Sequence, residues 1–497
     1  MATLSETKRL VWQRLDIESS LPLYRQIYER LRRAILTGNL SPGSKLPSTR
    51  GMAVELGIAR NTVMAAYEQL LAEGYLEGEP GSGTYVSKAL PEHLLNAALP
   101  ARLVAAAPGR SPKLSRRGAA LAAIRHPFNP EPSTARAFRL GSPALDAFPF
   151  ELWARLTARH WRSKPGHLLG YGDPAGHRPL REAIAAYLAT SRGVRCNASQ
   201  VIIVSGSQQG LDLAARMLLD RGDPAWIEDP GYRGIRGAFL AAGARLIPVP
   251  VDEEGMNFSS VAHKGDRVRL AYVTPAHQYP LGITMSMARR LALLEWANRA
   301  NAWILEDDYD SEYRYAGRPL AALQGIDRHE RVIYLGTFSK VFFPSLRLGY
   351  LVVPRSLIDP FVRARALCDG HPPTMAQAVL AEFMAQGHFA RHLRRMRHLY
   401  AERQEVLVRA ASRDLKGLLE VPASDGGMHL IGWLDEGIDD RAVARRVATG
   451  GIVTMPLSAL ASRPLRRGGL LLGYTGIDAR AIREGVRRLA EILEKSK

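Results

Sequence analysis

Two short strings decide the fold of this chain, Glu306-Asp307-Asp308-Tyr309-Asp310 and Thr337-Phe338-Ser339-Lys340. Each follows an apolar run, residues 302–305 before the first string and residues 331–336 before the second, and we expect both runs to be buried strands. Open α/β sheets hold their ligands at the carboxyl ends of parallel strands. We therefore expect the two strings to lie together at one edge of such a sheet.

The chemistry of the two strings suits an aldehyde cofactor such as pyridoxal phosphate. This cofactor needs a lysine amine to form an imine, an acid to keep its pyridine nitrogen protonated and a phenol to meet its ring oxygen. Lys340, Asp307 and Tyr309 offer these groups. A lysine after a strand can also be a plain surface residue, so the prediction rests on the whole set.

Composition bounds the class of protein. A chain of 497 residues should form two or more domains. No apolar run approaches the roughly 18 residues of a membrane span, and the first ten residues lack the apolar core of a signal peptide. The two cysteines, Cys196 and Cys368, show no pattern of a disulfide framework or a metal site. We expect a cytoplasmic protein without a metal.

The formal net charge of +19 makes a polyanionic partner plausible. Residues 1–135 hold 17 Lys+Arg and 11 Asp+Glu, a net of +6, so the excess charge is spread over the chain rather than confined to its head.

Three regions follow one another. Residues 1–87 predict an α-rich head, residues 88–135 a basic linker rich in Ala, Pro and Arg, and residues 136–497 an α/β body. The linker is expected to be partly helical around 118–124, and it is either a solvated spacer or a contact to phosphates. Strands are expected at 201–204, 225–228, 245–249, 269–273, 303–305 and 332–335. Their alternation with helices predicts a largely parallel sheet covered on both faces.

The head has the pattern of a winged helix-turn-helix. Apolar spacing predicts helices over 21–36, 49–56 and 59–73, with Ser48 capping the second, and a hairpin over 75–86. Such a bundle could mediate protein contacts only, but its polar surface favours DNA. The expected base-edge contacts are Arg60, Asn61 and Thr62, and the expected phosphate contacts are Lys45, Arg50 and the wing, where Gly81 and Gly83 allow close approach.

The strings KLPSTR (45–50), LGIARNTV (56–63), EGYL (73–76) and GSGTYV (81–86) resemble the GntR family of bacterial transcription regulators. The resemblance covers nearly all of residues 21–86. It implies that Arg50, Arg60 and Thr62 contact operator DNA.

Three features of the body add to the candidate cofactor residues Lys340, Asp307 and Tyr309. The string SGSQQG (205–210) follows an expected strand and opens a helix, whose free N–H groups suit a phosphate. Tyr232 follows another strand and could stack on a flat cofactor, and Arg347 could pair with a phosphate. Taken singly, each has a plain reading as a turn, a packing residue or a solvated arginine.

Together with YGDPAG (171–176) and TPAHQYPLG (274–282), these strings resemble fold-type I pyridoxal-phosphate enzymes of the aminotransferase class over roughly residues 137–490. The resemblance implies that Lys340 forms the imine, that Asp307 pairs with the pyridine nitrogen and that Tyr309 meets the ring hydroxyl. It also implies that Tyr232 stacks on the cofactor ring and that Tyr171 reaches over from the partner subunit. The phosphate would be held by Ser207, Gln208, Ser339 and Arg347.

The order of head, linker and body resembles the MocR (GabR-like) subfamily of GntR regulators over the whole chain, as do the strings EDDYDSE (306–312) and His277-Gln278. This resemblance implies a homodimer whose body senses pyridoxal phosphate, alone or with an amino compound. One feature departs from the pattern. Aminotransferases hold the substrate α-carboxylate with an arginine near the carboxyl end, but PLSAL (456–460) and LLLGYT (470–475) contain none. Whether Arg463, Arg466 or Arg467 points inward stays open.

Two hypotheses follow. The first is a pyridoxal-phosphate-dependent transcription regulator in which ligand binding to the body biases the spacing of two heads on DNA. The second is a true aminotransferase with an accessory head, in which Lys340 would be the catalytic base. The missing arginine favours the regulator, with pyridoxal phosphate itself or an amine without a carboxylate as effector.

Overall fold

The structure is a computed structural model that describes residues 15–16, 19–79, 81–90, 114–123, 137–163, 166–261, 267–316 and 321–495. It divides into two compact units, Met1–Lys113 and Leu114–Lys497. Most of the expected linker, 88–135, lies outside the described residues, so its boundaries and role stay a prediction. Within it, helix α6 (Arg116–Ala122) begins after Ser115, whose hydroxyl accepts the Gly118 N–H at 3.0 Å.

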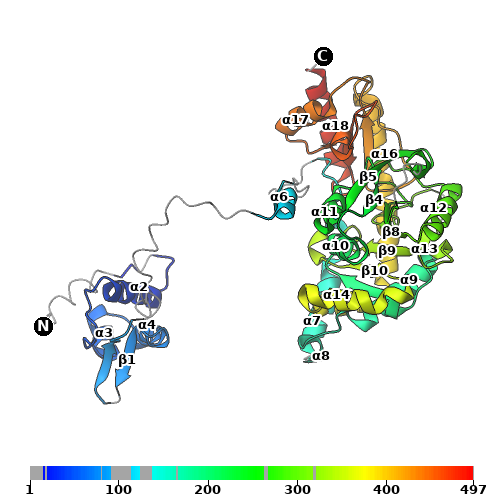
Figure 1. The fold of residues 1–497 in the computed structure, drawn as a ribbon. Coiled ribbons are helices and arrows are strands. Elements are labelled where there is room, and N and C mark those ends of the chain that lie inside the picture. The colour runs from blue at the N-terminus through cyan, green and yellow to red at the C-terminus, as the bar shows by residue number, and fades with distance from the viewer. Residues whose placement is uncertain are drawn as a thin grey trace. The chain divides into compact units, whose positions relative to one another are not determined.

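The first unit is a three-helix head with a two-stranded wing (Figure 1). Its elements are α2 (Leu23–Leu36), α3 (Thr49–Leu56), α4 (Arg60–Ala72), β1 (Leu76–Glu79) and β2 (Gly83–Val86). The predicted winged helix-turn-helix is confirmed. Helix α2 begins two residues later than predicted because Pro22 is its N-cap, and α4 begins one residue later because Ala59 is extended.

Local sequence explains the ends of α3. The Ser48 hydroxyl accepts the Gly51 N–H at 3.1 Å and thereby satisfies a backbone donor that the helix cannot. Gly57 ends the helix in the left-handed region, with φ 64°, which a side chain would disfavour. A fully buried apolar core that includes Leu31, Val63 and Leu70 holds the three helices together.

The second unit is the body, and its main sheet has eight strands in the order β3-β10-β9-β8-β7-β4-β5-β6. These strands are β3 (Val201–Val204), β4 (Pro224–Asp229), β5 (Arg245–Asp252), β6 (Gly255–Met256), β7 (Leu270–Val273), β8 (Trp303–Asp308), β9 (Val332–Thr337) and β10 (Gly349–Val352). Strands β5, β4, β7, β8 and β9 are parallel, whereas β10 runs antiparallel to β3 and to β9. All six strands expected from the sequence are present.

Helices cover both faces of this sheet (Figure 1). They are α7 (Phe150–Arg162), α9 (Arg178–Ser191), α10 (Ser207–Leu218), α11 (Arg233–Ala242), α12 (Met287–Arg299), α13 (Leu323–Ile326), α14 (Ile358–Asp369) and α15 (Thr374–Ala385), and the short α8 (Gly166–Leu169) packs on α15. Successive side chains of a strand point to opposite faces. In β8, Leu305 packs with Leu211 of α10 on one face, whereas Ile304 packs with Leu293 of α12 on the other.

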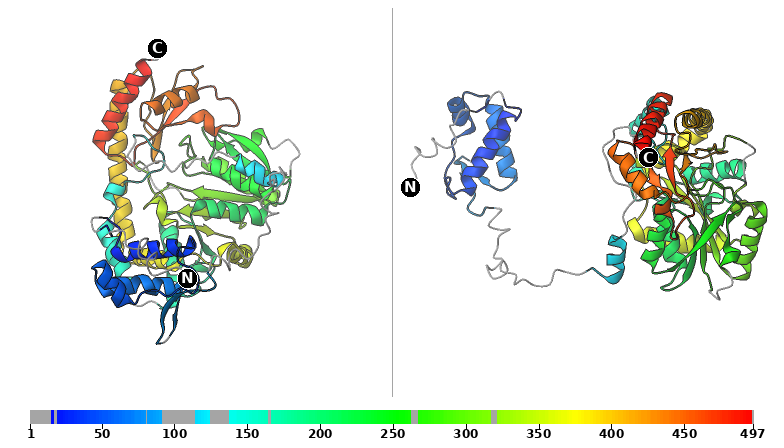
Figure 2. Two further views of the ribbon diagram at one scale, coloured as in Figure 1. Left: turned by 90° about the vertical axis from the view of Figure 1, so that its left-hand side faces the viewer. Right: turned by 90° about the horizontal axis from the view of Figure 1, so that it is seen from above.

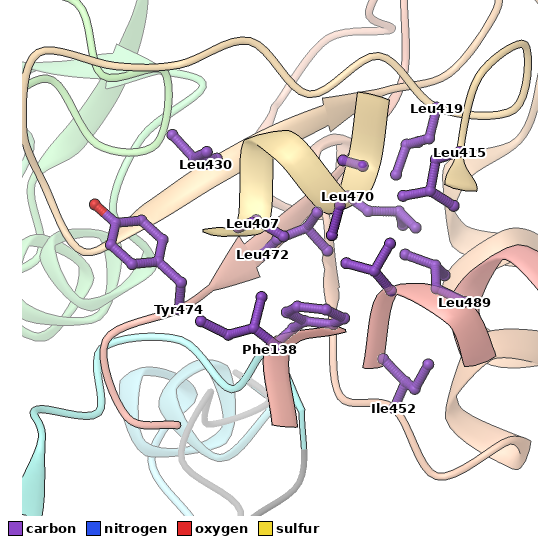
Figure 3. Close-up of a cluster of buried hydrophobic side chains, with 14 of the residues drawn as sticks. Phe138, Leu407, Leu415, Leu419, Leu430, Ile452, Leu470, Leu472, Tyr474 and Leu489 are labelled. Carbon is purple, nitrogen blue, oxygen red and sulfur yellow. The ribbon is translucent and has the colours of Figure 1, made fainter. Parts of the chain in front are cut away.

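A smaller lobe completes the body. It contains α16 (His388–Asp414), α17 (Asp440–Thr449), α18 (Ala479–Glu494) and the antiparallel strands β11 (His429–Trp433), β13 (Gly469–Gly473) and β12 (Met455–Pro456). Helices α16 and α18 lie side by side (Figure 2). Leu470 and Leu472 of β13 enter the core beneath these helices with Leu407 and Leu489 (Figure 3). Leu471, between them, therefore faces the opposite side of the small sheet.

No helix of the described ranges is long and apolar enough to cross a membrane.

Candidate cofactor site and DNA-binding surface

The two strings that the sequence singled out meet at the carboxyl edge of the main sheet. Asp307 and Asp308 end strand β8, and in the register of the parallel pair they lie opposite Leu335 and Gly336 of β9. Lys340 follows the end of β9 by three residues. The prediction that these strings lie side by side is confirmed.

Lys340 has the environment of a nucleophilic amine. Its Nζ donates to the carbonyl oxygen of Gly141 at 3.2 Å. Gly141 has φ 65°, and a Cβ added there would lie 2.3 Å from Nζ, so the close approach needs glycine. Burial lowers the pKa of Lys340, and the charges of Asp310 and Asp307 only partly oppose this. A lowered pKa leaves more of the amine unprotonated and able to attack a carbonyl carbon.

Asp307 is the acid of the site, and it is only 5% exposed. Its Oδ2 accepts a hydrogen bond from the hydroxyl of Tyr272 at 2.8 Å, whereas Oδ1 has no hydrogen-bond partner among the described residues. Burial raises the pKa of Asp307 to about 7, although the Tyr272 hydrogen bond and the Lys340 charge act in the opposite direction. An unpaired, buried carboxylate oxygen is costly unless a cationic donor meets it. A protonated pyridine nitrogen is such a donor.

Tyr309 lies beside this acid. Its hydroxyl is 3.0 Å from Nδ1 of His277, and the same nitrogen is 3.1 Å from Oδ2 of Asp310. Burial works to lower the pKa of His277, but the Asp310 carboxylate outweighs it, so the pKa of His277 is raised. The phenol expected to meet the cofactor is therefore held by a histidine–aspartate pair.

Tyr232 is the N-cap residue of α11, and its ring lies 6.0 Å from that of Tyr279 in an edge-on arrangement. Burial raises the pKa of Tyr232 to about 12, with a further rise from the charge of Asp307 and an opposing effect from Arg347. The charges of Asp307 and of the expected phosphate ligand Arg347 thus both act on the pKa of Tyr232. We expect this of a residue that stacks on a cofactor lying between them.

The start of α10 has features that suit the expected phosphate cradle. Gly206, the N-cap, has φ 87°, and the first N–H groups of the helix have no acceptor within it. The guanidinium of Arg347 donates to the carbonyl oxygen of Ser205, and a Cβ on Gly206 would lie only 3.1 Å from that guanidinium. Ser207 is the first residue of the helix. Helix dipole, backbone donors and arginine suit a phosphate together.

The remaining predicted cofactor residues fall into two groups. Gln208 lies in the first turn of α10, and its amide donates to the Gly234 carbonyl at 3.0 Å. Ser339 follows β9, and its N–H donates to Thr337 Oγ1 at 3.2 Å. Tyr171 is fully exposed in this single chain, with its ring 6.1 Å from that of His371. Its reach into a partner subunit stays a prediction.

An apolar wall borders the site beside Lys340. Leu471 of β13 is fully buried and packs with Leu457 and Leu460, and the partly buried Leu140 and Tyr279 join this cluster. Leu140 precedes the Gly141 carbonyl that holds Lys340, and the Tyr279 ring lies 5.8 Å from that of Tyr309.

Two of the three arginines left open by the sequence are paired with acids, and the third is exposed. Arg466 bonds to Glu436 at 2.9 Å, Arg467 bonds to Glu420 at 2.8 Å, and Arg463 is exposed. The wall beside Lys340 is therefore leucine-rich, and these three arginines make their contacts elsewhere.

Sequence reasoning missed three groups of the site. Tyr272 was included only in an expected strand, His277 only in a family string, and Gly141 not at all. A tyrosine inside an otherwise apolar strand is a signal that could have identified Tyr272, because β7 pairs directly with the strand that carries Asp307. The contact from Gly141 to Lys340 spans 199 positions and leaves no local signal.

The second candidate surface lies on the head. Arg60 and Asn61 are exposed at the amino end of α4, and Thr62 is half-buried there. Arg50 is exposed on α3, and an open hollow between the two helices is lined by Arg50, Val54 and Arg60, among others.

The wing lies beside Lys45, whose ammonium is 5.6 Å from the centre of the Tyr85 ring. Gly81 and Gly83 adopt positive φ in the turn and at the start of β2. The head thus presents its predicted DNA residues to solvent, and their contacts with DNA stay a prediction.

Two family models match the chain. Residues 23–86 match the bacterial regulatory proteins of the gntR family, and residues 137–488 match aminotransferase class I and II. The probable rhizopine catabolism regulatory protein MocR of Rhizobium meliloti is 46% identical over 475 residues, which cover 96% of this chain and 94% of that protein. The pyridoxine biosynthesis transcriptional regulator PdxR of Corynebacterium glutamicum is 32% identical over 92% of this chain and 93% of its own length.

Among solved structures, the body is similar to LysN, the α-aminoadipate aminotransferase of Thermus thermophilus, complexed with N-(5'-phosphopyridoxyl)-L-leucine. The two are 31% identical with a TM-score of 0.67, over 72% of this chain and 92% of that chain.

Proposed function

The chain belongs to the family of HTH-type transcriptional regulators that join a gntR-type head to an aminotransferase class I and II body, and from this premise we propose that pyridoxal phosphate bound at Lys340 controls its action on DNA. The cofactor would supply an aldehyde carbon that captures primary amines. The body would then serve as a sensor, and the head would carry the response to DNA.

The observation that carries the cofactor assignment is the unpaired oxygen of Asp307. Oδ1 is buried without a hydrogen-bond partner among the described residues, and the charge of Lys340 acts on the pKa of this acid. Pyridoxal phosphate offers a protonated ring nitrogen to Asp307, an aldehyde to Lys340 and a phosphate to the cradle beside Arg347. Each of these groups meets a residue of complementary chemistry.

The apolar wall favours a particular class of amino effector. An α-carboxylate placed against Leu471, Leu457 and Tyr279 would lose its hydration without gaining a cationic partner from that cluster. A primary amine without a carboxylate at that end avoids this cost. Pyridoxal phosphate alone, or pyridoxal phosphate with such an amine, is therefore the effector that we propose.

We further propose that the protein acts as a homodimer. The full exposure of Tyr171, beside the 60% exposed Leu169, supports an interface that covers this part of the body. Two bodies would hold two heads at a fixed spacing, and a cofactor-dependent change between the bodies would alter that spacing.

An absorbance spectrum of the purified protein tests the cofactor assignment. Loading with pyridoxal phosphate should give a band near about 420 nm that borohydride abolishes. The Lys340→Ala variant should lack this band while its thermal melt shows an intact fold. A band of equal strength in Lys340→Ala would refute the assignment.

DNA binding is tested by selecting genomic fragments with the full-length protein, with and without pyridoxal phosphate. Specific binding that weakens with salt and that depends on cofactor in the wild type, but not in Lys340→Ala, is expected. Selection of the same fragments with the same affinity in all four conditions would leave the head as a DNA reader but would contradict control by the cofactor.

The second candidate function is an aminotransferase, since Lys340, Asp307 and the phosphate cradle are all present. The leucine-rich wall argues against amino-acid turnover. Steady conversion of an amino-acid donor and a keto-acid acceptor at about 1 per second or faster would favour the enzyme. A spectral change limited to a single half-reaction would favour the sensor.

A further inference from the structure

A second cavity lies behind the cofactor site, on the side of His277 that faces away from Tyr309. We call it the back cavity, and its volume is about 330 Å³. The residues that matter here are His277, Gly282, Asp310, Arg314, Ser424 and Gly427. Lys340, Asp307 and the phosphate cradle are absent from its lining, so it shares with the site described above only the pair His277 and Asp310.

Two glycines fix the imidazole of His277 between the cofactor site and this cavity. A Cβ on Gly427 would lie 2.2 Å from Cε1 of the ring, and a Cβ on Gly282 would lie 3.2 Å from Nε2. Nδ1 is turned toward Tyr309 and Asp310. Nε2 consequently lies on the side of Gly282, where a Gly282 Cβ would also lie 3.7 Å from the Ser424 hydroxyl.

The wall of the back cavity holds polar atoms that lack hydrogen-bond partners within the described part of the chain. Asp310 is 1% exposed, and its Oδ1 has no hydrogen-bond partner among the described residues. Three further residues of the lining each have an atom without a partner among the residues that the structure describes: Nε2 of His277, Oγ of Ser311 and Nε of Arg314. Buried polar atoms without partners are costly, so clustering them at one cavity indicates a polar occupant.

The unsatisfied atoms include both hydrogen-bond acceptors and hydrogen-bond donors. Asp310 Oδ1 accepts hydrogen bonds, whereas the Arg314 Nε–H donates. The raised pKa of His277 favours the charged ring, which makes Nε2 a donor as well. Two further charged residues of the lining are already paired: Arg192 bonds to Asp308 at 2.8 Å, and Asp425 lies 3.3 Å from Arg314. The Asp310 carboxylate therefore remains as an acceptor for the occupant, Arg314 and His277 remain as donors, and the Ser311 hydroxyl can act as either.

We propose that the back cavity binds a small zwitterion of the α-amino acid class, with its ammonium group at Asp310 and its carboxylate at Arg314 and His277. The volume suits a molecule of that size. Because His277 also contacts Tyr309, occupancy would change how firmly the Tyr309 phenol is held. The link from Tyr309 to the cofactor rests on the proposed function, whereas binding in the cavity does not.

The test uses full-length protein loaded with pyridoxal phosphate and then reduced with borohydride, which blocks the amine of Lys340. Each of the twenty common L-amino acids is titrated by calorimetry up to about 10 mM, where a site of millimolar affinity is largely filled. At least one should bind. Its α-carboxamide and its α-hydroxy acid, which lack the carboxylate and the ammonium respectively, should each bind about tenfold or more weakly.

Variants locate the binding. Ser424→Trp fills the cavity and should abolish binding, whereas Ser424→Ala leaves it open and should preserve binding. Arg314→Met, at the partly exposed mouth, should weaken the amino acid about tenfold but should leave its α-carboxamide unaffected. This second variant keeps the test valid if the tryptophan disturbs folding.

Two results would overturn the proposal. One is that no amino acid binds the reduced protein, and the other is that binding survives both Ser424→Trp and Arg314→Met. Lys340→Ala separates this proposal from the proposed function, because it removes cofactor attachment and should still bind the amino acid. Loss of binding in Lys340→Ala, with retention in Ser424→Trp, would assign the amino acid to the cofactor site and refute the back cavity alone.

Discussion

Replacing Tyr272 by phenylalanine should weaken the binding of pyridoxal phosphate in a pH-dependent way. The Tyr272 hydroxyl donates to Asp307 Oδ2 at 2.8 Å, and both side chains are buried. The substitution removes this hydrogen bond and keeps the ring. Since the bond stabilises the ionised carboxylate, its loss should raise the pKa of Asp307 further above its value of about 7.

The size of the effect follows from the type of bond. A hydrogen bond to a charged group contributes about 1.5–3 kcal/mol, and about 1.36 kcal/mol corresponds to one pKa unit. The pKa of Asp307 should therefore rise by about one to two units. Near neutral pH the cofactor-free variant would hold a protonated acid opposite the pyridine nitrogen, and pyridoxal phosphate should bind about tenfold more weakly. The ionised form is populated above the pKa, so this difference should shrink as the pH rises beyond about 9.

An absorbance titration with pyridoxal phosphate over a pH series measures the effect. Tyr334→Phe is the matched control, because its hydroxyl donates to the adjacent Asp308 at 2.5 Å from the neighbouring strand β9. It should leave cofactor affinity unchanged. Equal losses in both variants, or a loss in Tyr272→Phe that does not vary with pH, would refute the reasoning.

Three further predictions concern the cradle, the head and the buried acids. Gly206→Ala should weaken pyridoxal phosphate binding, because its Cβ would crowd the guanidinium of Arg347. Gly222→Ala, also at positive φ but with open space around it, should lower only the melting temperature. A cofactor titration and a thermal melt of both variants separate the two effects. Arg50→Ala should reduce the slope of log affinity against log salt for DNA by about 1, whereas Arg25→Ala, on α2 and paired with a glutamate, should leave it unchanged in the same titration. Burial raises the pKa of Glu228 to about 7. The stability that this carboxyl contributes is therefore present below its unfolded pKa of about 4 and lost as the pH rises through about 7. Melting temperatures of the cofactor-free protein should fall over this range, and they should fall less in Glu228→Gln.

The parts of the molecule that depend on short-range pattern were predictable. The head helices follow apolar spacing and end at residues with a local role, such as Ser48 and Gly57. The strands of the body are short apolar runs, and parallel pairing places their polar ends together. This is why Asp307 and Lys340 could be brought to one edge before the sheet order was known.

The parts that depend on long-range packing were not predictable. Whether Arg466 and Arg467 point toward the cofactor is decided by acids that lie 30 and 47 positions away. The Tyr272 hydrogen bond requires that β7 and β8 be neighbours, which one sequence does not reveal. The back cavity requires the large lobe, with Asp310, and the small lobe, with Gly427, to meet at His277.

Strand β13 explains why recognition of a carboxylate would be separated from the amine site. Its side chains alternate, so Leu470 and Leu472 fill the small-lobe core while Leu471 closes the wall beside the cofactor site. A cation at position 471 would be fully buried among Leu457 and Leu460, and burying a charge in apolar surroundings is costly. The wall therefore favours apolar contacts. An amino acid that this body detects must be held by its carboxylate elsewhere, and the back cavity, joined to Tyr309 through His277, offers the donors that the wall lacks.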